Sequence, residues 1–235
     1  MSADGDLLAL FGAIASGDQT EIARRLDASP GLATRPIRVG ASRQDPATYF
    51  LTPIRHYVYG GDTALHVAAA THLRELAESL VASGADVRAR NRRGAEPLHY
   101  AADGSPGAAR WKPVAQREVI AFLIGAGADP DAFDKSGVAP LHRAVRTRSS
   151  AAVGALIEYG ADPRLMNKSG STPLHLAVQN TGRSNSGSEA AKDEQDRIIT
   201  LLLGHGARPT DVDAKGKTVA AAASSDWIRQ RLGIV

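Results

Sequence analysis

The chain contains no cysteine, few aromatic residues and no long apolar run. The lack of cysteine excludes structural disulfides and metal sites built on thiolates. Aromatic residues make up only 5% of the 235 residues, so leucine, alanine, valine and isoleucine must fill the core. The apolar stretch 7–14 is too short to span a bilayer, and it follows Asp4 and Asp6 instead of the positive charges of a signal peptide. We therefore expect a cytoplasmic protein with no membrane partner.

A strong excess of one charge is also missing. Lysine and arginine total 28 and aspartate and glutamate 25, which gives a formal charge of +3. This surplus is too small to indicate nucleic acid as a partner. The richness in alanine and arginine indicates a GC-rich bacterial genome.

The chain has no nucleophile elbow, no phosphate-binding glycine loop and no His-Glu-x-x-His motif, so we expect no enzymatic activity, no metal and no cofactor.

What the chain does contain is one four-residue phrase that recurs four times. It reads Thr63-Ala64-Leu65-His66, Glu96-Pro97-Leu98-His99, Ala139-Pro140-Leu141-His142 and Thr172-Pro173-Leu174-His175. The four histidines are separated by 33, 43 and 33 residues. Self-similarity with a period of 20–50 residues is typical of stacked-repeat proteins, in which each unit buries its apolar face against a neighbour.

Each phrase leads into the same local pattern. A short alanine-rich helix is expected first, then a second helix with apolar residues at helical spacing. Each second helix ends in a Gly-Ala pair, where glycine suits a left-handed C-cap. The four glycines at this point are Gly84, Gly127, Gly160 and Gly206. Turn residues ending in another glycine follow, as in the segment Asn167-Lys168-Ser169-Gly170.

Phrase, two helices, Gly-Ala pair and turn together resemble the ankyrin repeat family. The resemblance implies an all-α fold: a solenoid of helix-turn-helix units with β-hairpin loops, forming one domain over residues 1–235 with about five to six repeats. The expected repeats are approximately 6–33, 61–93, 94–136, 137–169, 170–216 and 217–235. The resemblance also implies that the phrase histidines His66, His99, His142 and His175 hydrogen-bond hairpin backbone. They lie on successive helices about 8–10 Å apart, too far from one another to share a metal ion.

Three insertions of 22, 10 and 13 residues interrupt the period, at approximately 34–60, 104–112 and 182–193. They either form a binding site or are neutral loops. The first holds Tyr49, Tyr57 and Tyr59 and predicts strands around 49–52 and 54–59. It either packs its aromatic residues on repeats one and two or presents an aromatic contact surface.

The other two insertions make local predictions. In the second, Trp111 either holds the loop down or is an exposed anchor, and Pro113 is expected to begin a helix. In the third, Ser186 and Glu189 form a potential capping box.

Each expected hairpin carries cations at its tip. The tip residues are Arg92, Arg93, Lys135, Lys168 and Lys215, and Arg88 and Arg90 extend the row. Such a row either only solvates the surface or attracts an acidic partner.

The leading functional prediction is a non-enzymatic module that binds another protein on the concave surface of hairpins and first helices, and an acidic protein is the partner that the row of cations would favour. We expect a monomer. The predicted contact residues are Tyr57, Tyr59, Arg92, Arg93, Tyr100, Lys135, Arg143, Arg146 and Gln179. The alternative is a small-molecule binder or unusual enzyme in which residues 49–59 close a pocket near His56 and Tyr57.

Overall fold

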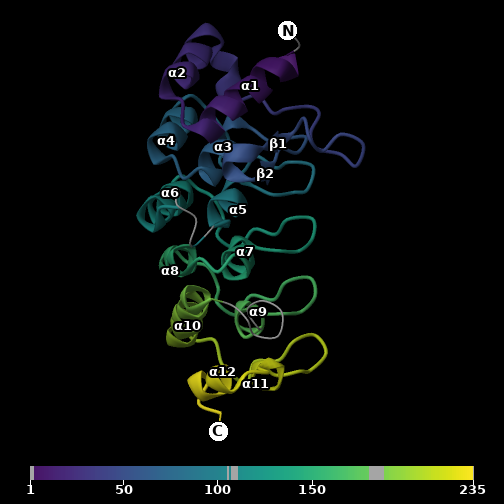
Figure 1. Cartoon of the computed structure of the whole chain (residues 1–235), viewed down its shortest axis with the longest axis vertical. Helices are drawn as coiled ribbons and strands as arrows, with labels where there is room; N and C mark the ends of the chain where they lie inside the picture. Colours follow the sequence, from purple (N-terminus) through teal and green to yellow (C-terminus); the bar gives the residue numbers. More distant parts are fainter. Residues whose placement is uncertain (1–2, 105, 107–110, 180–187, 235) are drawn as a thin grey trace. The chain divides into compact units, whose positions relative to one another are not determined.

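The computed structural model describes residues 3–104, 106, 111–179 and 188–234, and most of its secondary structure is helical (Figure 1). The chain divides into two compact units. Unit 1 comprises Met1–Ala101 and Glu118–Asp129, and unit 2 comprises Ala102–Arg117 and Pro130–Val235. Helix α6 (Pro113–Gly125) contributes residues to both units.

Unit 1 begins with the helix pair α1 (Ala3–Ser16) and α2 (Gln19–Ala28), followed by the 3-10 helix η1 (Pro30–Ala33). The pair is joined at Gly17, whose φ of 77° is left-handed, and Asp18 caps α2 by accepting the N–H of Glu21. Helix α1 packs on α2 and on α3 (Ala64–Ala70), and α3 packs on α4 (Arg74–Ala82). The expected helix pair within residues 6–33 is therefore present.

The first insertion forms a small antiparallel pair, β1 (Phe50–Leu51) and β2 (His56–Tyr57), separated by the 3-10 helix η2 (Thr52–Ile54). The strands are shorter than predicted because η2 and Arg55, with a φ of 52°, interrupt the extended backbone. The buried side chains of Ile37 and Val58 anchor the insertion, and β1 and η2 contact α1. Aliphatic residues thus hold the insertion in place, while Tyr57 remains 40% exposed.

Unit 1 also contains most of α5 (Pro97–Ala102) and the part of α6 from Glu118 onward. Unit 2 contains three further helix pairs. These are α7 (Pro140–Arg146) with α8 (Ser150–Glu158), α9 (Pro173–Ala177) with α10 (Glu189–Gly204), and α11 (Val219–Ala222) with α12 (Asp226–Arg231). First helices contact first helices, α7 with α9 and α9 with α11, while α10 contacts α8 and α12. Buried alanines such as Ala144, Ala155 and Ala177 allow this close approach.

The helix ends follow the sequence signals closely. All four Gly-Ala glycines have a φ between 91° and 104°, which is the expected left-handed C-cap. Helix α6 begins at Pro113, and the Nε1 of Trp111 donates to the Oε1 of Gln116 at 2.9 Å, in agreement with a residue that holds the loop down. Ser186 lies outside the described residues. The N-cap of α10 is Ser188, whose hydroxyl accepts the N–H of Ala191.

Candidate interaction surface

Each hairpin is organised by one aspartate or asparagine side chain at the start of its turn. Before α7, the Oδ1 of Asp134 accepts the N–H of Ser136 at 2.8 Å and that of Val138 at 3.1 Å. Equivalent pairs of bonds are made by Asn91, Asn167 and Asp213. The backbone N–H groups of Lys217 and Lys215 are among the causes that hold the pKa of Asp213 below its ordinary value. These side chains are used to shape the turns.

The phrase histidines connect successive repeats. The Nδ1 of His66 accepts the N–H of Thr63 at 3.1 Å, so the ring proton lies on Nε2 and is donated to the carbonyl oxygen of Ala95, also at 3.1 Å. The same arrangement recurs at His142, which donates to the carbonyl of Ser171, and at His175, which donates to that of Lys217. The Nδ1 of His99 accepts the N–H of Glu96.

These contacts confirm the expected bond to hairpin backbone for His66, His142 and His175. Burial lowers the pKa of both His66 and His142, so their rings are neutral at pH 7. Among the described residues, no group of three histidine, aspartate or glutamate side chains is arranged to hold a metal ion.

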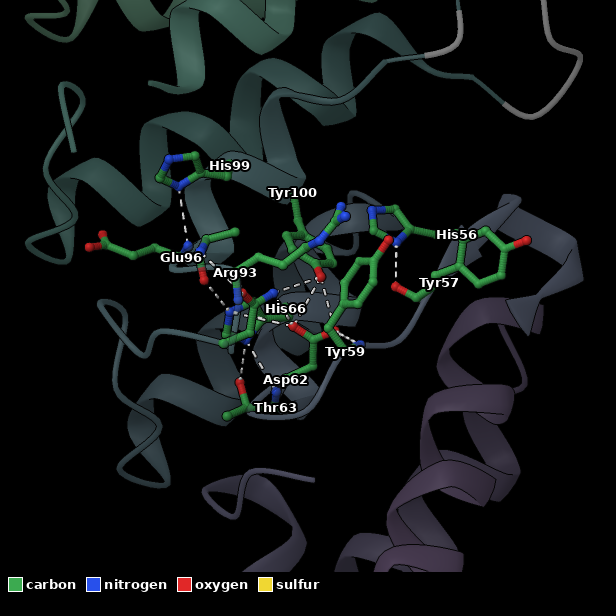
Figure 2. Close-up of polar contacts among 12 residues, drawn as sticks. His56, Tyr57, Tyr59, Asp62, Thr63, His66, Arg93, Glu96, His99 and Tyr100 are labelled. Atoms are coloured by element: carbon green, nitrogen blue, oxygen red, sulfur yellow. Dashed lines mark hydrogen bonds and ion pairs between the residues drawn. The ribbon is translucent and has the colours of Figure 1, made fainter. Parts of the chain in front are cut away.

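A buried carboxylate in unit 1 connects three segments of the chain (Figure 2). Asp62 accepts the hydroxyl of Tyr100 at 2.9 Å, the Nδ2 of Asn91 at 2.8 Å and the backbone N–H of Tyr59 at 2.7 Å. The Nε2 of His66 lies 3.9 Å from its Oδ1. Tyr59 belongs to the first insertion, Asn91 to the next hairpin and Tyr100 to α5. The carboxylate therefore fixes the end of the insertion against two repeats.

Tyr100 has a structural role that the sequence does not predict. Its side chain is only 3% exposed, and its ring stacks on that of His56 with centroids 4.4 Å apart. Because its hydroxyl donates to Asp62, Tyr100 supports the fold. Its burial leaves little of the side chain for the predicted contact with a partner.

Three other predicted contact residues come together at the first hairpin tip. The guanidinium carbon of Arg93 lies 4.5 Å from the ring centroid of Tyr59, and that of Arg92 lies 5.5 Å from it. Arg92 also donates to the carbonyl oxygen of Ala41. These contacts hold both cations against the insertion. Tyr57 lies outside this cluster, with its ring 4.8 Å from that of Phe50.

In unit 2, the predicted contact residues differ in their exposure. Lys135, Arg146 and Gln179 have exposed side chains on a hairpin tip, on α7 and after α9. Arg143 is half-buried, and its Nη1 lies 3.2 Å from the Oδ2 of Asp103. That ion pair reduces the availability of Arg143 to a partner.

Cations on the second helices are neutralised by carboxylates, whereas those at the hairpin tips are not. Among the described residues of α2, α4, α6, α8, α10 and α12, every cation except Arg229 belongs to an ion pair. The paired residues are Arg24, Arg25, Arg74, Arg117, Lys192, Arg197 and Arg231. None of the five tip cations has an ion pair with any described residue.

Two cations do not extend the row of tip cations as the sequence predicts. Arg88 lies 3.7 Å from a carboxylate oxygen of Asp129, and Arg90 lies 2.9 Å from one of Glu96. Burial raises the pKa of Glu96, and the ion pair with Arg90 opposes that shift. Arg88 and Arg90 are therefore partly neutralised.

The residues that were expected to close a small-molecule pocket make contacts with the fold instead. His56 stacks on Tyr100, and its Nδ1 lies 2.9 Å from the carbonyl oxygen of Tyr57. A groove of about 610 Å³ does exist in unit 1, between α2 and α4. None of the residues that line it belongs to insertion 34–60.

Asp62 is the residue at the centre of the hydrogen-bonded cluster in unit 1, and the sequence prediction missed it. It follows the turn glycine, at a position that Ala95, Val138, Ser171 and Lys217 occupy in the other repeats. An acidic residue is found there only in this repeat. Its signal in the sequence is this departure from the other repeats, which a position-by-position alignment of the repeats would reveal.

Comparison with known families agrees with the architecture. The ankyrin repeat model matches residues 60–92 and 169–217, and a model of three ankyrin repeat copies matches residues 108–186. No curated protein matches the chain. Within the described residues, no helix has the length and apolar character needed to cross a membrane. The matched ranges together span more than half of the sequence, and the chain belongs to the ankyrin repeat family.

Proposed function

We propose that this protein is a non-enzymatic binding module that contacts an acidic segment of another protein with its hairpins and first helices. Ankyrin repeats generally mediate protein–protein interaction, which supports the class of function. The observation that carries the specific proposal is the difference in charge pairing. Every described cation on the second helices except Arg229 forms an ion pair, while none of the five tip cations forms one with a described residue. Unpaired surface cations attract an acidic partner and orient its approach.

The surface is preorganised for binding, because few of its loops and side chains must become ordered when a partner binds. The turns are held by side-chain bonds to backbone, as in the hairpin of Asp134. The guanidinium group of Arg93 is already positioned over the ring of Tyr59. Preorganised groups lose less conformational entropy on association, so a few anchors can provide most of the affinity. We propose Arg93, Lys135 and Arg146 as these anchors.

The test is affinity capture from the native cell lysate, read by mass spectrometry, with three forms of the protein. The first is wild type and the second is the tip variant R93E/K135E. The third is the matched control K112E/R229E, which changes two exposed cations away from the hairpins by the same charge. We expect wild type and control to retain the same proteins and the tip variant to lose them, with thermal unfolding unchanged in all three. Equal capture by the tip variant would contradict the proposal.

A further inference from the structure

Unit 2 exposes a large apolar side chain at one equivalent position of three hairpins. Phe133, Met166 and Val212 are 39%, 46% and 43% exposed. Each immediately precedes the aspartate or asparagine that shapes its turn. Isolated exposed apolar residues are ordinary, but recurrence at the same position of neighbouring repeats is not. We call these three residues the apolar row.

Backbone hydrogen bonds hold the three hairpins in a fixed register. The N–H of Lys168 donates to the carbonyl oxygen of Gly137 at 2.9 Å. One repeat later, the N–H of Ala214 donates to the carbonyl oxygen of Gly170 at 3.2 Å. Because the same positions are joined at both steps, equivalent side chains are displaced by one repeat, about 10 Å. Figure 1 shows the hairpins before α7, α9 and α11 on the same side of their helices.

A basic row accompanies the apolar one. Lys135 lies two positions after Phe133, and Lys168 lies two positions after Met166. In the third hairpin, Lys215 lies three positions after Val212. All three lysines are exposed, and no described carboxylate forms an ion pair with them. The intervening Asp134 and Asp213 accept backbone N–H groups. The hairpins of unit 2 therefore present apolar and cationic side chains side by side along the chain, repeated three times.

We propose that these two rows bind an acidic segment of the partner that carries apolar side chains about 10 Å apart. This inference rests on the proposed function and specifies the chemistry of the bound segment. A polyproline II helix suits the spacing, because three residues per turn and a rise of about 3.1 Å bring every third side chain to one face about 9 Å further along. Carboxylates between the apolar residues then face the lysines. The hairpins are already ordered, and a polyproline II segment is stiff, so little entropy is lost.

Two other occupants fit less well. Nucleic acid would use the lysines but leave Phe133, Met166 and Val212 without a function, and the formal charge of the chain is only +3. A second copy of this chain could cover the apolar row. It would, however, bring a second set of three lysines to the same interface, where like charges repel.

The probe for the test is a fluorescein-labelled peptide with four repeats of the tripeptide glutamate-proline-leucine. Binding to the full-length protein is measured by fluorescence anisotropy at low and at physiological salt. One control peptide replaces every glutamate by lysine, and another has the same composition with its leucines grouped together. We expect the first peptide to bind at least tenfold more tightly than either control. Absence of binding, or equal binding of the grouped peptide, overturns the proposal.

Protein variants identify where the peptide binds. We expect F133S/M166S and K135E/K168E each to weaken binding of the glutamate peptide at least tenfold. The matched controls are V114S/Y159S, which alters two exposed apolar residues outside the hairpins, and K112E/R229E, which makes the same charge change as K135E/K168E. Both controls should bind as wild type does. Unaltered binding by F133S/M166S, or equal loss in the controls, overturns the assignment of the site.

Two further measurements separate this inference from the proposed function. Sedimentation of wild type should show no self-association through the hairpins. A dimer that F133S/M166S dissociates would assign the apolar row to a second copy and overturn the proposal. If the peptide fails to bind while lysate capture still depends on Arg93 and Lys135, this inference is wrong and the proposed function stands. If the peptide binds at the hairpins but lysate capture ignores those residues, the proposed function is the one contradicted.

Discussion

The Nε2 of His66 lies 3.1 Å from the carbonyl oxygen of Ala95, so a side chain of one repeat hydrogen-bonds the hairpin of the next. The Nδ1 of the same ring accepts the N–H of Thr63 at the start of α3. One buried imidazole thus satisfies a helix terminus and an inter-repeat carbonyl at once. His142 and His175 repeat this arrangement in unit 2. The repeated phrase is therefore a stacking device, and its removal at one repeat should have local consequences.

Replacing His142 by alanine should destabilise unit 2 by about 3 kcal/mol. The change leaves the N–H of Ala139 and the carbonyl of Ser171 without their partner and opens a cavity between repeats. Urea denaturation measures the loss, and hydrogen exchange should locate it at residues 139–171. Surface substitutions usually change stability by less than about 0.5 kcal/mol. A change that small in His142→Ala would contradict the assigned role.

The control for this prediction is His205→Ala, because the His205 side chain is exposed and its ring contacts the carbonyl oxygen of Leu201 one turn earlier in α10. We expect it to change stability by less than about 0.5 kcal/mol. Addition of a chelator should leave the melting temperature of wild type unchanged, since these histidines bind backbone and not metal. A chelator-dependent drop would require a different explanation for the phrase.

Stability should fall as the pH is lowered below about 6.5, the ordinary pKa of histidine. Burial depresses the pKa of His66 and of His142 in the folded state, so the unfolded chain binds more protons in this range. By linkage, each such histidine contributes stability that is fully present above its unfolded pKa, and the loss approaches about 1.4 kcal/mol per pH unit. Urea midpoints measured between pH 7 and pH 5 test the sign.

The contribution of one ring can be isolated with His142→Gln, which has no proton to gain. Its stability should be lower than that of wild type at pH 7 but should fall less steeply toward pH 5. Parallel curves for the two proteins would exclude His142 as a source of the pH dependence. Carboxylates titrate mainly below this range, so they affect both proteins equally.

Tyr100→Phe should loosen the first insertion without affecting the hairpins of unit 2. The hydroxyl is one of three donors to the buried carboxylate of Asp62, and its loss leaves that charge less well compensated. We expect a destabilisation of about 1–3 kcal/mol and faster hydrogen exchange at the N–H of Tyr59. Tyr57→Phe is the matched control, because that side chain is exposed, and it should behave as wild type. Equal exchange in both variants would rule out the proposed role of Asp62.

Much of the fold could be predicted because its signals are local and repeated. Pro113 begins α6, and the glycine of each Gly-Ala pair has the left-handed φ that a C-cap requires. These residues act through their own backbone, so the sequence around them is sufficient. The family assignment is confirmed for the same reason, while the number of repeats stays a prediction.

The parts that the sequence did not predict depend on distant partners. The hydroxyl of the buried Tyr100 donates to Asp62, which lies 38 residues earlier in the sequence. Arg143, at the same position of a later repeat, is only half-buried. The predicted strands of the first insertion are cut short where Arg55 adopts a positive φ between them. Arg90 is partly neutralised because Glu96 occupies a position that holds threonine or alanine in the other phrases. Each depends on a pairing that a repeat consensus does not encode.

Gly137→Ala should disturb the stacking of the hairpins more than the same change at Gly216. Both glycines have a left-handed φ, 67° and 76°, so alanine brings a similar backbone cost of about 1–2 kcal/mol at either position. An added Cβ at Gly137 would lie 2.4 Å from the Cβ of Lys168, while nothing lies within 4 Å of one at Gly216. The difference in stability between the two variants therefore isolates the contact between hairpins. We expect Gly137→Ala to be less stable by at least a further 1 kcal/mol in urea denaturation and to bind the glutamate-proline-leucine peptide more weakly, because the register of Phe133 with Met166 is lost. Equal destabilisation and equal peptide binding would mean that the hairpins of unit 2 are not held in register by this contact.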